Sequence, residues 1–107
     1  MPYRIPWMTG VDRLLLDWFE EKDVVAKPSV VAVNLERELS EEEMPSAGQI
    51  RRRMKYLEEE AGLLEQYGDA RGQYMISEKG WRYFNEEMSE DERLELATLD
   101  PQQGGDS

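Results

Sequence analysis

The feature of this sequence that most constrains its fold is the segment LLEQYGDARGQYMIS, residues 63–77. Two short apolar stretches, LLEQYG and GQYMIS, are joined by a connection in which Gly68 and Gly72 bracket Asp-Ala-Arg. Glycine readily adopts the left-handed backbone conformations of tight turns, so the pattern predicts a two-stranded hairpin. A lone hairpin is marginally stable in water, so we expect it to pack on the segments around it.

The segments on both sides of the hairpin carry the start signals of helices. The spacing of a capping box, a hydroxyl followed three residues later by a carboxylate or an amide, occurs at Thr9–Asp12, Ser46–Gln49 and Ser89–Glu92. Pro28 opens the helical stretch PSVVAVNL, where its missing amide costs nothing, and Ser77 precedes SEKGWRYFNEEM. These signals predict five helices, the last of them short.

Apolar spacing predicts which face of each helix is buried. In the first helix Val11, Leu14, Leu15 and Trp18 recur at helical spacing, which places Asp12 on the solvent side. The corresponding stripe of the third helix consists of Ile50, Met54, Leu57 and Ala61.

The order of the elements predicts the fold class. Helix, short strand (DVVA, residues 23–26), helix, loop, helix, hairpin and helix is the order of a winged helix-turn-helix, a mainly α fold with a small β-hairpin wing. We expect an N-terminal arm at residues 1–8, a winged-helix domain at 9–88, a C-terminal helix at 89–99 and a flexible polar tail at 100–107.

The composition excludes several classes of function. The 107 residues include no Cys and no His, which excludes disulfides, thiolate or imidazole metal sites and histidine-based catalysis. We therefore expect no enzyme, no cofactor and no metal. No apolar run approaches the roughly 20 residues of a membrane span, and the first residues lack the apolar core of a signal peptide. A cytoplasmic protein without membrane contact is the expectation.

Positive charge gathers on one segment of this acidic chain. Between Pro45 and Leu57 there are four basic residues and no acid, although the formal net charge is -11. This segment is the predicted third helix, the element that enters the DNA major groove in a helix-turn-helix. The predicted DNA contacts are Ser46, Gln49, Arg51, Arg52, Arg53 and Lys55 on this helix and Arg71 at the tip of the wing.

These residues differ in their expected roles. Arg52 is the candidate for a base contact, because Arg bonds guanine bidentately. Arg53 and Lys55 are expected to meet phosphates. The alternative is a solvated helix face whose cations pair with Glu58 and Glu59.

Both ends of the chain carry apolar residues beyond what a monomer of this size needs. The alternatives are packing on their own domain or burial in a homodimer, and we favour the homodimer because regulators of this shape pair symmetrically on half-sites. The predicted dimer residues are Ile5, Trp7, Leu94, Leu96, Ala97 and Leu99.

The sequence resembles a known family. YMISEKG after the predicted wing is similar to its Y.IT.KG motif, GLL before the wing to its L…GLL step, and WMTGVDRLLLDWF and PSVVAVNL to its first two helices. These motifs resemble winged-helix domains of haloarchaeal regulators related to a halophage repressor, within the MarR/ArsR/PadR-like set, over roughly Trp7 to Met88. The resemblance implies a DNA-binding transcriptional regulator, commonly a dimeric one. An acidic chain with more Arg than Lys is also typical of a salt-adapted cytoplasm.

The sequence departs from this family before the third helix. Leu35 and Ser46 are separated by ten residues rather than a short turn. Five of these are acidic, namely Glu36, Glu38, Glu41, Glu42 and Glu43. Acids beside a DNA-facing edge repel phosphates, so an alternative function is a winged-helix adaptor that binds proteins and not DNA.

Overall fold

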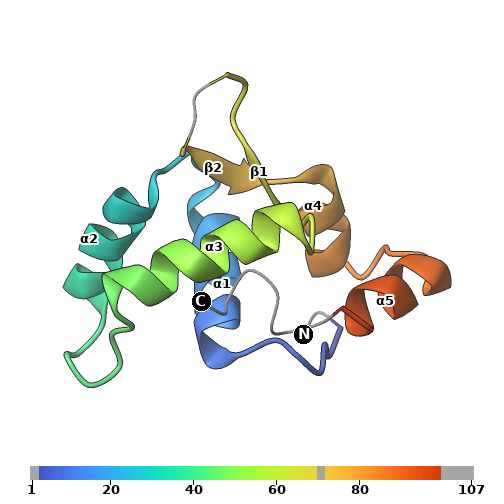
Figure 1. Cartoon of the computed structure of the whole chain (residues 1–107), viewed down its shortest axis with the longest axis horizontal. Helices are drawn as coiled ribbons and strands as arrows, with labels where there is room; N and C mark the ends of the chain where they lie inside the picture. Colours follow the sequence, from blue (N-terminus) through green and yellow to red (C-terminus); the bar gives the residue numbers. More distant parts are fainter. Residues whose placement is uncertain (1–2, 70–71, 100–107) are drawn as a thin grey trace.

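The computed structural model describes residues 3–69 and 72–99 and has the winged-helix order of elements (Figure 1). The elements are α1 (Gly10–Lys22), α2 (Pro28–Glu38), α3 (Ala47–Glu59), β1 (Leu64–Gln66), β2 (Tyr74–Ile76), α4 (Glu78–Phe84) and α5 (Glu90–Ala97). The predicted fold class, mainly α with a small hairpin wing, is confirmed. Arg71 and the predicted tail at 100–107 lie outside the described residues.

The predicted caps fix where the helices begin. Thr9, Ser46 and Ser89 each accept a hydrogen bond from the backbone amide three residues later, and the side chain at that position accepts one from the cap amide. Each box satisfies two amides that have no partner within the helix. Ser77 accepts from Gly80 N–H and starts α4.

The core is built around α3, which packs against α1, α2 and β1. Ile50, Met54 and Leu57 of the predicted stripe are fully buried on α3, and Ala61 is buried just after the end of the helix. Tyr56 is buried as well. On α1 the apolar face is rotated from the one expected. Leu15, Leu16, Trp18 and Phe19 are buried, Val11 and Leu14 only partly so.

The expected solvent position of Asp12 is wrong, because its side chain is buried. Its carboxylate accepts hydrogen bonds from the amide and the hydroxyl of Thr9. Burial of a carboxylate is tolerated only where hydrogen bonds and an opposite charge compensate its lost hydration, and both are present here.

The hairpin pairs β1 and β2 antiparallel, with Leu64 opposite Ile76 and Gln66 opposite Tyr74. Gly68 and Gly72 have φ values of 50° and 79°, in the left-handed region that the predicted turn requires. The stretch DVVA does not form the short strand that was predicted. It contributes a single bridge, in which Ala26 and Tyr74 exchange two backbone hydrogen bonds of 2.9 Å.

The arm packs on its own domain. The Trp7 indole donates to the carbonyl oxygen of Leu96 at 2.6 Å and meets the Tyr56 ring edge-on at 5.1 Å. Ile5, Trp7 and Leu96 are all buried within the chain. These three expected dimer residues are therefore reassigned to the core, because each satisfies its apolar surface inside one subunit. Leu94 stays 64% exposed.

Helix α5 and helix α2 lie at opposite ends of the molecule, with α3 crossing between them and the wing above (Figure 1). Within residues 3–69 and 72–99, no helix combines the length and the apolar character needed to cross a bilayer.

The contact between α4 and the wing gives a test of this fold. A Cβ atom at Gly80 would clash with the Leu63 carbonyl oxygen and stand 2.8 Å from a methyl group of Ile76. We expect Gly80→Ala to lower the free energy of unfolding by about 1–3 kcal/mol, measured by urea denaturation. Gly10→Ala is the control, since nothing lies within 4 Å of its added Cβ. Equal stability of the two variants would contradict this packing.

Candidate nucleic-acid interface

Helix α3 presents a cationic face opposite its buried stripe. Burial of Ile50, Met54 and Leu57 fixes the rotation of the helix, so that Arg51, Arg52 and Lys55 are exposed. Across the described part of the chain, no ion pair or hydrogen bond engages these three side chains. The predicted alternative, pairing with Glu58 and Glu59, is not seen. The three cations are therefore available to a phosphate or a base edge.

The polar residues at the start of α3 are exposed but partly engaged. Ser46 Oγ accepts from the Gln49 amide at 3.1 Å, and Gln49 Oε1 accepts from the Ser46 amide at 3.0 Å. Among residues 3–69 and 72–99, no acceptor is bonded to the Gln49 NH₂ group. Gln49 thus combines a structural role at the cap with free hydrogen-bonding capacity toward a ligand.

The third arginine of the run lies elsewhere. Arg53 donates from Nε to Asp12 Oδ1 at 2.7 Å and from Nη2 to Oδ2 at 3.0 Å. Its guanidinium lies 4.5 Å from the centre of the Tyr56 ring, and its side chain is only 13% exposed. The expectation that Arg53 meets phosphate is therefore revised, because this guanidinium is already neutralised by a carboxylate of its own chain.

The Asp12–Arg53 pair joins the first turn of α1 to the middle of α3. The Thr9 amide, the Thr9 hydroxyl and two guanidinium nitrogens all donate to the Asp12 carboxylate. A buried ion pair repays its desolvation only when the geometry is good and the remaining lone pairs are satisfied, as they are here. Sequence reasoning missed this pair, although Arg53 borders the apolar stripe at three residues from Ile50.

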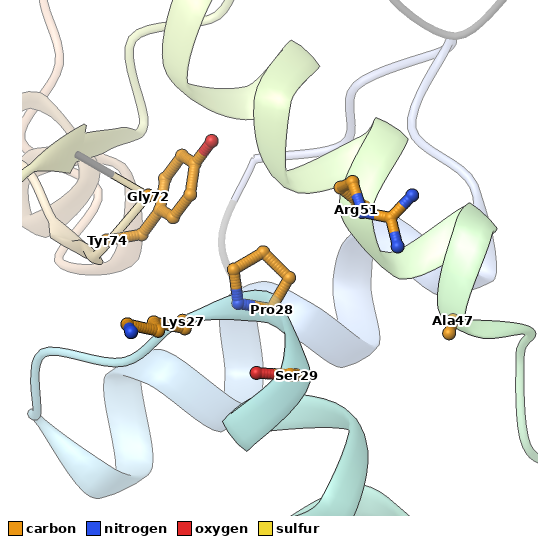
Figure 2. Close-up of a pocket in the computed structure, with 7 residues that line it drawn as sticks. All are labelled: Lys27, Pro28, Ser29, Ala47, Arg51, Gly72 and Tyr74. Atoms are coloured by element: carbon orange, nitrogen blue, oxygen red, sulfur yellow. The ribbon is translucent and has the colours of Figure 1, made fainter.

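A groove separates the cationic face from the wing. Its first part, a hollow of about 370 Å³, lies where α2 begins and is shown in Figure 2. It is lined by Lys27, Pro28, Ser29, Ala47, Arg51, Gly72 and Tyr74. A second hollow of about 490 Å³ shares Arg51, Gly72 and Tyr74 and extends to Lys55, Gln66 and Glu59. The two hollows form one groove along α3.

Tyr74 forms part of the groove wall as a neutral side chain. Its pKa is raised above the ordinary tyrosine value, first because burial disfavours the phenolate and then because Glu58 and Glu59 lie nearby. At neutral pH the hydroxyl is therefore protonated and adds no negative charge to the groove.

Lys27 was not among the predicted site residues. It is exposed, lines the first hollow and has no ion pair within residues 3–69 and 72–99. The available signal was its position directly before Pro28, at the start of the second helix.

The acidic loop before α3 lies on the far side of this helix from the wing (Figure 1). Leu39 and Pro45 anchor it, since they line a hollow together with Val11 and Leu14 of α1. Glu41 and its two successors are exposed. None of the five acids before α3 lines either hollow of the groove.

In the part of the chain that the structure describes, no group of three or more Asp or Glu side chains is placed to hold a metal ion.

The sequence matches the winged helix-turn-helix phage repressor family over residues 1–97. The chain belongs to the winged helix-turn-helix phage repressor family. The match covers the arm, all five helices and the wing, and it confirms the phage-repressor part of the sequence resemblance. No curated protein and no solved structure matches the chain significantly.

Membership in the phage repressor family points to a DNA-binding regulator, a class that is not typically enzymatic. In a helix-turn-helix the second helix of the motif enters the major groove. Helix α3 occupies this position in the present family member, with Arg51, Arg52 and Lys55 exposed.

The arginine run of this phage repressor family member allows a matched test. Arg53→Met leaves the buried Asp12 carboxylate without its counter-charge, so we expect the free energy of unfolding to fall by about 3 kcal/mol. Arg51→Met makes the same change two residues away on an exposed face, where we expect an effect within about 0.5 kcal/mol. Chemical denaturation measures both. Similar stabilities would show that the ion pair does not hold α3.

Proposed function

We propose that this protein is a transcriptional repressor that binds double-stranded DNA as a homodimer, with α3 in the major groove. The observation that carries the proposal is the exposed cationic face of α3, where Arg51, Arg52 and Lys55 have no partner within the described residues. In a chain of net charge -11, three uncompensated cations on one helix face favour a polyanionic ligand.

The roles of the individual residues follow from their positions. Arg52 contacts a base edge, since its guanidinium can bond guanine bidentately. Arg51 and Lys55 flank it and bind phosphates. Gln49 and Ser46 add polar contacts near the helix start. Arg71 remains a proposed wing-tip contact outside the described residues.

The overall acidity supports action in a salt-rich cytoplasm, such as that of haloarchaea. Phosphate contacts release counterions, so their contribution to affinity fades as salt rises. Base contacts and buried apolar surface must then carry more of the binding. An acidic surface elsewhere on the protein also suppresses nonspecific attraction to DNA.

Fluorescence anisotropy with labelled duplexes enriched from the host genome tests this proposal. The logarithm of the binding constant should fall with the logarithm of salt concentration, with a slope of about −0.9 for each phosphate contact. We expect Lys55→Gln to remove about one such contact per bound subunit and to weaken binding similarly for all sequences. Arg52→Ala should reduce discrimination between duplexes by about 1–3 kcal/mol.

The control in this experiment is Lys79→Gln. This change removes one lysine charge from α4 and leaves α3 unaltered, so the slope should stay unchanged. Absence of binding at moderate salt, with the wild-type protein folded, would reject DNA binding and favour the adaptor function.

The proposed homodimer uses α5 and the arm. A hollow of about 380 Å³ lies between them, lined by Tyr3, Arg4, Ile5, Glu90, Arg93, Leu94 and Ala97. Leu94 is exposed beside it, and Leu99 is half-buried nearby in sequence. The surface carries both signs of charge, so two copies related by a two-fold axis can place Arg93 against Glu90 of the partner.

The dimer is tested by light scattering after size exclusion. We expect Leu94→Glu to convert a dimer into a monomer, because it places a charge in the apolar centre of the contact. Val33→Glu is the matched control, since Val33 is 57% exposed on α2 at the other end of the molecule. A monomeric wild type, or equal dimerisation of both variants, would reject this contact surface.

A further inference from the structure

The groove between α3 and the wing is bordered by a cation of α3 and by a second cation from outside this helix. Figure 2 shows Pro28 near the centre of the first hollow, with Lys27 on the side of Tyr74 and the wing, and Arg51 on α3 on the other side. Two cations from different elements thus border a floor that is mostly apolar. Pro28 lies between the two cations, and the Tyr74 ring and the Ala47 methyl group add to the apolar lining on either side.

The position of Lys27 is set by the fold. The two hydrogen bonds between Ala26 and Tyr74 fasten the connection between α1 and α2 to strand β2 of the wing. Pro28 then starts α2, with Lys27 as its cap residue. The lysine is therefore held at the junction of the wing and α2, 24 residues before Arg51 in the sequence.

We propose that this groove seats the sugar–phosphate backbone of one DNA strand, with Lys27 as a phosphate-binding residue. A nucleic-acid strand alternates charged phosphates with largely apolar sugars, and the groove alternates in the same way: a cation, an apolar floor and a second cation. Ser29 adds a hydroxyl beside the floor as a hydrogen-bond donor to a phosphate oxygen. This inference rests on the proposed function and assigns it a second anchoring surface.

The order of the charged residues along the groove also indicates the path of the bound DNA strand. From Lys27 the groove passes Arg51 and Lys55 and reaches Glu59 in the second hollow. A phosphate is attracted by the first three residues and repelled by the last. The strand therefore follows α3 over its basic turns and leaves the groove before Glu59. Tyr74 presents no opposing charge because it is protonated.

The two hollows have three lining residues in common and together make one long groove along α3. A polymer strand can occupy such a groove over its whole length, whereas a small anion would fill only part of it. The proposed site contacts the sugar–phosphate backbone and no base, so its contribution to the binding affinity is independent of DNA sequence. It fixes the position of the duplex while α3 reads the base edges.

The test is the salt dependence of binding to a fluorescein-labelled duplex of mixed sequence, with the full-length protein. We expect Lys27→Gln to reduce the steepness of the slope by about 0.9 per bound subunit and to weaken all duplexes alike. Ala47→Glu is a second variant that places a carboxylate over the apolar floor and should weaken binding. An acidic residue in the first turn of a helix favours the helix, so this variant keeps its fold.

Lys79→Gln is the matched control, since it removes one lysine charge from α4 and lines neither hollow. The proposed backbone-binding site is supported if Lys27→Gln makes the salt dependence of binding less steep and Lys79→Gln does not. It is overturned if both lysine variants bind like the wild type while Arg52→Ala loses discrimination, in which case the proposed function stands without it. A wild-type protein that binds no duplex rejects this site and the proposed function together.

Discussion

The buried ion pair between Asp12 and Arg53, together with the buried stripe of Ile50, Met54 and Leu57, fixes how α3 is rotated on the rest of the domain. It joins the capped first turn of α1 to the middle of α3, with both carboxylate oxygens satisfied. A helix held only by apolar contacts can slide or rotate at modest cost, whereas a charged pair out of water loses several kcal/mol when its geometry is broken. The exposed position of Arg51, Arg52 and Lys55 depends on this constraint.

The three successive arginines therefore divide into two tasks. Arg53 turns inward and holds the helix, and the two before it turn outward. Helical geometry favours such a division, because three successive residues span about 200° around the axis and cannot all lie on one face. The outward face then lies beside the wing, which the Ala26–Tyr74 bridge holds against the connection that leads into α2.

Cationic residues and exposed apolar residues lie on different parts of the surface of this molecule. Lys27, Arg51 and Lys55 border one groove, and the acidic residues of the loop before α3 do not line it. Trp7 and Ile5 cover the core beside α5 and leave Leu94 at the surface. This distribution separates the surface proposed for a polyanion from the surface proposed for a second subunit, at different ends of the same small domain.

The sequence by itself determined the order of elements, the caps at Thr9, Ser46 and Ser89 and the buried stripe of α3, because these depend on near neighbours in the chain. Only the tertiary structure decided which arginine is bound by Asp12, that Trp7 belongs to the core and that Lys27 stands beside the wing. Asp12 and Arg53 are 41 residues apart, and no local periodicity specifies such a contact. Packing of α1 against α3 brings them together, and burial then makes their pairing obligatory.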